Sequence, residues 1–129
     1  MYYKYDVYTT FPGSAIMNSM AWTIIVFESK RGEKFVEELV KSLDSQTIAK
    51  VGSEIDLLEK HGQFLGMPHA KKLNSELYEL RIRGKQEARI VYAFAGKKIY
   101  LLHAFKKQTQ KTPLREIHTA IKRLAMIQH

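Results

Sequence analysis

The stretch LYELRIRGKQEARIVYAFAGKKIYLLHAF, residues 77–105, decides the fold of this chain. In its first seven residues, Tyr78, Leu80 and Ile82 alternate with Glu and Arg. Period-two alternation places successive side chains on opposite faces of a strand, so this segment is predicted to be a strand with one apolar face and one charged face.

Two more strands follow within the same stretch. Residues 88–95 repeat the alternation less strictly, and residues 99–105 are apolar on both faces, as expected of a central strand. Residues 84–87 and the Ala-Gly-Lys-Lys sequence at 95–98 have the composition of short turns. Three strands joined by short turns predict an antiparallel meander.

Two amphipathic helices are predicted upstream of the meander. Apolar residues recur at spacings of three and four in residues 33–43 and again in residues 48–58, and Gly62 follows the end of the second pattern. Ser45 stands where a helix cap belongs. Two such helices form a hairpin with one apolar face, which must be buried against a sheet.

The flanking segments complete the predicted domain. Residues 22–28 (WTIIVFE) are β-branched and aromatic, which favours a strand, and Pro113 is suited to begin a final amphipathic helix. The order βααβββα indicates an α+β fold. We expect an antiparallel sheet, made of the N-terminal strand plus the three-strand meander, packed on the helical hairpin, with a C-terminal helix.

The domain organisation follows from length and composition. The chain has 129 residues, enough for one domain, which we place at residues 21–129. Residues 1–20 differ in composition and are interpreted as an N-terminal extension, with Met17 and Met20 as alternative start sites. No stretch has the length of a membrane span, and the N-terminus lacks the apolar region of a signal peptide, so we expect a cytoplasmic protein with no membrane partner.

Charge is divided unevenly along the chain. Residues 1–68 have seven Lys and Arg against nine Asp and Glu, whereas residues 69–129 have fourteen against four, which gives the net charge of +8. Clustered cations bind polyanions by releasing counterions and by steering association at long range. This asymmetry favours nucleic acid as the partner.

The residue types present exclude several kinds of chemistry. The chain has no Cys, which removes disulfides, thiolate nucleophiles and Cys-type zinc sites. Its five His residues have no metal-ligand spacing and no accompanying Asp cluster. We therefore expect no metal and no cofactor.

Arginines of the meander are the first candidate site residues. Alternation places Arg81 and Arg83 on the face opposite the apolar residues of their strand, and Arg89 on the corresponding face of the next strand. A guanidinium binds phosphate oxygens in a bidentate manner and stays charged at any working pH. The alternative is a solvent-facing row paired with Glu79 and Glu87.

Lysines flank this predicted surface. The run HAFKKQTQKTP, residues 103–113, leaves the last strand with three lysines in six positions, which is typical either of a phosphate-binding loop or of a solvated loop. A second pair lies in the predicted loop HAKKL before the meander. The candidate lysines are Lys71, Lys72, Lys106, Lys107 and Lys111.

His103 is the best candidate for proton transfer near neutral pH, because it is the only His within a strand pattern and leads into the lysine-rich run. The alternative is a core histidine held by a backbone carbonyl. Tyr78, Tyr92 and Tyr100 could stack on bases, although strand aromatics are more often core residues. Arg and Lys can stabilise the phosphorane of metal-free RNA cleavage, and a lysine crowded by cations, or His103, can transfer protons.

Four blocks together resemble a known family. GMPHAKKL (66–73), LYELRIR (77–83), ARIVYAF (88–94) and HAFKKQTQKTPLREIHTAIKR (103–123) are similar to the RelE/HigB-type toxins of type II toxin-antitoxin systems, in the phage-derived branch of that superfamily. The likeness covers residue 22 to the C-terminus. It implies a small basic α+β toxin that cleaves mRNA on the translating ribosome and is inhibited by an antitoxin, often a helix-turn-helix protein.

By motif position, the resemblance implies that Arg81 and Arg89 stabilise phosphate and that Lys106 and Lys107 form the basic pair ending the last strand, with Lys71 and Lys72 as a weaker correspondence. Some RelE members use a Tyr in the C-terminal segment, and residues 113–129 contain none. The general acid and base are therefore left open. Two alternatives remain: a ParE-like poison of DNA gyrase and a non-catalytic nucleic-acid-binding module.

Overall fold

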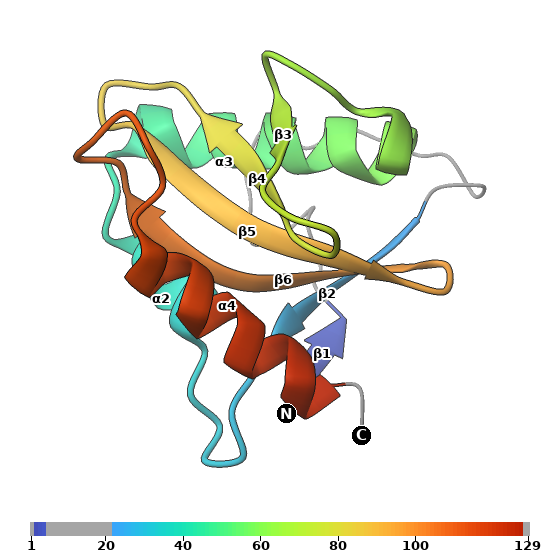
Figure 1. Cartoon of the computed structure of the whole chain (residues 1–129). Helices are drawn as coiled ribbons and strands as arrows, with labels where there is room; N and C mark the ends of the chain where they lie inside the picture. The colour runs from blue at the N-terminus through green and yellow to red at the C-terminus, as the bar shows by residue number, and fades with distance from the viewer. Residues whose placement is uncertain (1, 5–21, 128–129) are drawn as a thin grey trace.

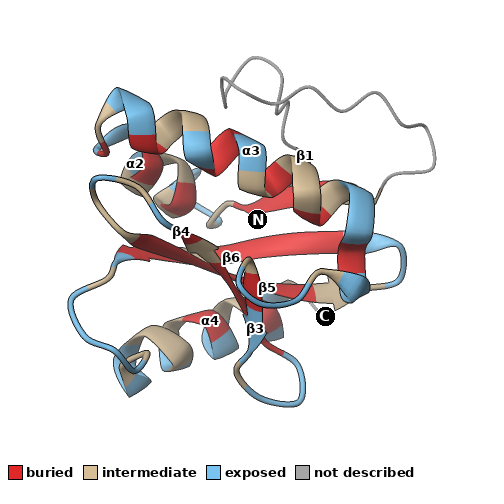
Figure 2. Ribbon diagram, turned by 90° about the horizontal axis from the view of Figure 1, so that it is seen from above, coloured by how far each residue is buried: buried red, intermediate tan, exposed pale blue. Residues whose placement is uncertain are grey.

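The structure, a computed structural model, describes residues 2–4 and 22–127 of the chain. Two helical layers enclose one sheet, with α2 and α3 on one face and α4 on the other (Figures 1 and 2). The elements in chain order are β1 (Tyr2–Lys4), β2 (Thr23–Phe27), α2 (Phe35–Lys41), α3 (Ser45–His61), the 3-10 helix η1 (Gly62–Phe64), β3 (Ala70–Lys72), β4 (Tyr78–Ile82), β5 (Ala88–Ala95), β6 (Lys98–Lys106) and α4 (Leu114–Ile127).

The strands of the sheet lie in the order β1-β2-β6-β5-β4-β3. The meander β4-β5-β6 is antiparallel as predicted, and the α+β class is confirmed. The pairing of β2 differs from the prediction, because it lies parallel to β6, with Thr23 opposite Lys98 and Val26 opposite Leu101. After β2 the chain passes through α2 and α3 and re-enters the sheet at its other edge, in β3. A connection of this length permits a parallel pair, which a short turn does not. The sheet is therefore mixed.

Two strands were not predicted from the sequence. The residues Lys71 and Lys72, expected in a loop, lie in β3, an antiparallel edge strand of β4. Residues 2–4 of the predicted extension form β1, which pairs with β2. The predicted domain boundary at residue 20 lies outside the described residues.

The helical hairpin covers one face of the sheet, as predicted. The buried residues Val36, Val51 and Ile55 of α2 and α3 pack in one core with residues such as Leu80 and Ile90 of the meander. The predicted cap was wrong by one residue: Asp44, not Ser45, caps α3 by accepting a hydrogen bond from Thr47 N at 2.9 Å. The reason is geometric, since a cap needs extended backbone, and Asp44 has it (φ −69°, ψ 160°) whereas Ser45 is already helical.

The opposite face is only partly covered. The buried residues Ala120 and Leu124 of α4 pack against apolar residues of β5 and β6, including Val91 and Leu102. The ends of β4 and β5 that carry the arginines lie beyond this contact, beside the loop that joins β6 to α4 (Figure 1). Among the described helices, none is long and apolar enough to cross a membrane.

Candidate active site

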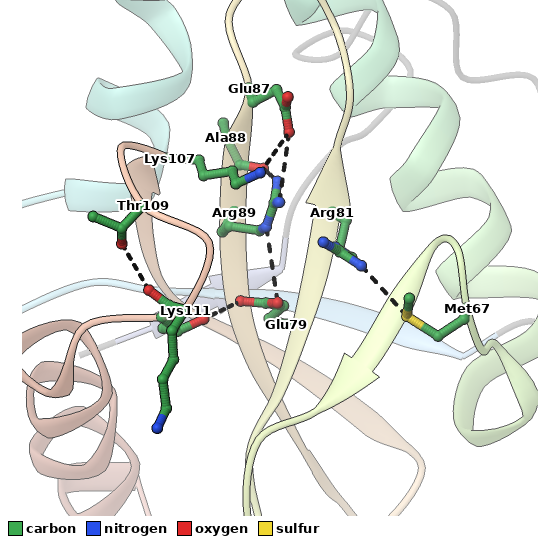
Figure 3. Close-up of polar contacts among 10 residues, drawn as sticks. Met67, Glu79, Arg81, Glu87, Ala88, Arg89, Lys107, Thr109 and Lys111 are labelled. Carbon is green, nitrogen blue, oxygen red and sulfur yellow. Dashed lines mark hydrogen bonds and ion pairs between the residues drawn. The ribbon is translucent and has the colours of Figure 1, made fainter.

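Arg81 and Arg89 are direct neighbours across two strands. They are register partners in the antiparallel pair β4-β5, so their side chains lie on the same face of the sheet (Figure 3). The predicted position of these two arginines on one face is confirmed. Arg89 is not part of an exposed surface, however, because it is only 3 % exposed. Arg81 is half-buried, and its Nη1 donates to the Sδ of Met67 at 3.5 Å.

Arg89 is held between two carboxylates. Its Nε lies 3.8 Å from Oε2 of Glu79, and its Nη2 lies 3.6 Å from Oε1 of Glu87, as Figure 3 shows. Its Nη1 donates to the carbonyl oxygen of Ala88 at 3.0 Å. Burial lowers the pKa of Arg89, although the two carboxylates act against this shift. The Nη2 group is buried and has no hydrogen-bond partner, because its ion pair with Glu87 is longer than a hydrogen bond.

Glu79 is a buried carboxylate, 4 % exposed, whereas the alternative interpretation of the sequence placed it on a solvent-facing row. The reason is the loop between β6 and α4, which folds back over the sheet and places Thr112 within reach. Thr112 Oγ1 donates to Oε1 of Glu79 at 2.6 Å. A charged group in this position needs partners, and Arg89 and Thr112 supply them.

Lys107 and Arg89 contact the same oxygen of Glu87, as Figure 3 shows. The Nζ of Lys107 is 3.5 Å from Oε1 of Glu87, and its backbone N donates to the Glu87 carbonyl at 2.9 Å. Desolvation raises the pKa of Glu87, but the charges of Lys107, Arg89 and Arg83 outweigh it and lower that pKa below its usual value. Glu87 is therefore an anion that holds two cations in place.

A pocket of about 450 Å³ opens beside Arg89 and Lys107, between α2, the end of β6 and the start of α4. It brings together five of the nine predicted site residues. These five are Arg89, His103, Lys106, Lys107 and Lys111. Arg115 also lines the pocket, and Glu116 is the one acidic residue among its lining residues.

His103 lies in this pocket with both ring nitrogens occupied. Its Nδ1 is 3.2 Å from Nη1 of Arg123, and its Nε2 is 2.6 Å from Oε1 of Glu116. Because an arginine only donates, Nδ1 accepts, and a neutral ring then carries its proton on Nε2, which donates to Glu116. Burial lowers the pKa of His103, and the bond to Glu116 offsets this only in part. His103 is thus held by two side chains, not by the backbone carbonyl of the alternative interpretation.

Lys106 and Lys111 line the pocket, whereas Arg81, Lys71, Lys72 and Arg83 are not among its lining residues. Lys106 is the register partner of Ala88, which is buried on the hairpin side, so Lys106 leaves the sheet on that side and is exposed. Lys71 pairs in register with Glu79 and shares the arginine face. The remaining three, Lys72, Arg83 and Lys111, are exposed.

A family model described as "Phage derived protein Gp49-like (DUF891)" matches residues 38–125, about two thirds of the chain. The chain belongs to the Gp49-like family. This family is part of the RelE/HigB-like toxin superfamily, and membership indicates a toxin module of a toxin-antitoxin system with an antitoxin as partner. No curated protein matches the sequence at a significant level.

The Gp49-like match begins in α2 and ends in α4, so it contains all nine predicted site residues and leaves out β1 and β2. Three residues that organise the site were missed by the sequence analysis as partners. These residues are Thr112, Glu116 and Arg123. Their polar character was visible, but the contacts depend on the fold of residues 107–113. No group of three or more potential metal ligands lies among residues 2–4 and 22–127.

Proposed function

We propose that this Gp49-like toxin is an endoribonuclease that cleaves mRNA on the translating ribosome. The observation that best supports this proposal is the charge of the pocket, where five Lys and Arg residues face one Glu around the end of β6. Such an excess of cations suits the phosphates of RNA. Arg81 adds a further guanidinium on the same face of the sheet.

The proposed reaction is attack of the 2′-oxygen on the adjacent phosphorus, with loss of the 5′-oxygen. The transition state carries more negative charge on the phosphoryl oxygens than the ground state does, and fixed cations nearby stabilise that charge. Arg81, half-buried and beside Arg89, is placed to contact these oxygens. Arg89 is the second cation proposed to stabilise this charge, because it lines the pocket and its Nη2 has no hydrogen-bond partner.

Proton transfer is assigned to Lys107 rather than His103. Both His103 nitrogens are hydrogen bonded, so the ring has no free position for a substrate proton. Lys107 lines the pocket, and its side chain is 18 % exposed. Lys107 and Arg89 both form an ion pair with the carboxylate of Glu87. His103 then acts as a positioning residue that joins β6 to α4.

Inducible expression followed by primer extension on cellular mRNA tests the proposal. We expect wild type to arrest growth and to produce in-frame cuts within translated codons. Lys107→Ala should lower cleavage about 100-fold or more, the usual loss on removing a proton-transfer group. Arg89→Lys should also lower cleavage, because Lys keeps the charge but lacks the planar fork.

Lys98→Ala is the matched control, since Lys98 is an exposed lysine at the opposite end of β6. It should cleave as wild type does. Full growth arrest by Lys107→Ala and Arg89→Lys would contradict the proposal. Breaks in DNA without cuts in mRNA would indicate gyrase poisoning instead, and neither kind of break would indicate a binding module.

A further inference from the structure

Two large apolar side chains are exposed on the segment between α3 and β3. Phe64, the last residue of η1, is 84 % exposed, and Met67 is 61 % exposed. Since Met67 is three positions after Phe64, their Cα atoms are at most about 11 Å apart. Two of the sheet tyrosines named above as possible stacking residues are buried, Tyr92 at 1 % and Tyr100 at 4 % exposed, and the third, Tyr78, is partly buried against the hairpin core.

The segment that presents Phe64 is fixed to the domain at several points. Leu65, next to Phe64, packs against the hairpin core, and its backbone N donates to the Gly62 carbonyl at 3.1 Å. The Nδ1 of His69 lies 3.0 Å from Oε1 of Glu54 on α3. Because the backbone is already ordered, a ligand that binds Phe64 does not have to order it.

This apolar pair adjoins the arginine face of the site. Arg81 Nη1 donates to Met67 Sδ at 3.5 Å, so Met67 touches the guanidinium assigned to phosphate (Figure 3). Lys71 and Lys72 of β3 are both exposed and follow the segment directly. Residues 60–75 contain no Asp or Glu. An exposed aromatic ring followed along the chain by cations is the composition of a single-stranded RNA surface.

We propose that Phe64 is a stacking platform for an unpaired nucleobase of the bound RNA, one or more nucleotides from the phosphate held by Arg81. This proposal rests on the proposed function, in which the bound RNA strand passes Arg81. Every base has a flat π face, so the platform adds affinity without reading sequence. An acidic protein partner would also find cations here, but it would gain nothing specific from a planar ring.

Binding of a 2′-O-methyl hexanucleotide to the full chain tests the platform, because this oligonucleotide lacks the 2′-hydroxyl and cannot be cleaved. We expect Phe64→Ala to weaken binding about tenfold, in line with the usual loss of a base-aromatic stack. Phe64→Trp should bind at least as tightly as wild type. A hexamer of the same backbone without bases should bind wild type and Phe64→Ala equally.

Leu114→Ala is the matched control, because Leu114 is 69 % exposed but lies on α4. It should leave binding unchanged. Equal binding of the normal hexamer by wild type and Phe64→Ala would overturn the platform, as would an equal loss on the hexamer without bases. Loss of antitoxin binding with unchanged RNA binding would also overturn it. If Phe64→Ala weakens binding only of the hexamer with bases, and the wild-type protein cuts no mRNA, the platform is supported and the nuclease is rejected.

Discussion

Arg89 and Lys107 are positioned by the same carboxylate oxygen, Oε1 of Glu87, at 3.6 and 3.5 Å. Arg89 is buried near the start of β5 and Lys107 lies in the loop that follows β6, so Glu87 couples a buried cation to a more exposed one. The carboxylate also cancels part of the charge that would otherwise attract RNA. Its removal should therefore affect binding and cleavage in opposite directions.

Glu87→Gln is expected to tighten RNA binding several-fold at low salt and to slow cleavage of bound RNA about tenfold. One negative charge fewer strengthens attraction to phosphate, while Lys107 loses the ion pair that orients it. Affinity and single-turnover rate, measured over a salt series, check both effects. Glu38→Gln changes the net charge equally at an exposed site on α2 and should leave the rate unchanged. Unchanged cleavage by Glu87→Gln would show that Glu87 does not orient Lys107.

His103 should make stability depend on pH. Burial lowers its pKa below the unfolded value of about 6.5, so the unfolded state binds a proton more readily than the folded state. Its contribution to stability is then fully present above about pH 6.5 and is lost as pH falls below that value. Urea midpoints at about pH 7.5 and 5.5 should differ more for wild type than for His103→Gln. An equal difference in both proteins would rule out His103 as the source.

The two glycines around η1 should respond oppositely to substitution by Ala. A Cβ on Gly62 would lie 2.1 Å from Nε1 of Trp22, and its φ of +54° is unfavourable for Ala. Gly62→Ala should therefore destabilise the fold by about 2 kcal/mol or more. A Cβ on Gly66 would have no atom within 4 Å, so Gly66→Ala should be neutral or slightly stabilising. Thermal unfolding of both variants checks this pair, and similar melting temperatures would contradict it.

Thr112→Val removes the hydrogen bond to Glu79 while nearly preserving the side-chain volume. We expect a loss of about 1–2 kcal/mol, because a buried carboxylate is left with one partner fewer. Thr109→Val is the control in the same loop, since Thr109 is exposed and its hydroxyl donates to the Lys111 carbonyl rather than to a buried group. Denaturant unfolding measures both. Equal stability of the two variants would show that the Thr112 bond does not hold the loop.

The sheet could be predicted from the sequence where its pattern was strong. Residues 77–105 alternate or are continuously apolar over three strands, and β4, β5 and β6 lie there within a residue or so of the predicted bounds. Short edge strands have no such signal. Lys71 and Lys72 form part of a three-residue strand, too short for a periodicity to be recognised.

The candidate site could be predicted only as a set of residue types. Alternation correctly placed Arg81 beside Arg89, because pairing in register follows from the meander. The burial of Arg89 and Glu79 could not be predicted, since it depends on Thr112 and a loop with no regular pattern. The same holds for His103, whose partners Glu116 and Arg123 lie on α4.

The parallel pairing of β2 with β6 joins the first part of the domain to the last, because Thr23 pairs with Lys98, 75 residues later in the chain. Contacts this distant in sequence cost more loop-closure entropy than local contacts do, and they slow folding. During synthesis, a chain that ends before β6 has neither the centre of the sheet nor Lys107, and proteolysis of stalled chains would detect this open state. The surface that carries the proposed RNA cleavage is thus completed only after β6 and the loop that follows it have been synthesised, and under the proposed function this delays action on the ribosome that makes the toxin.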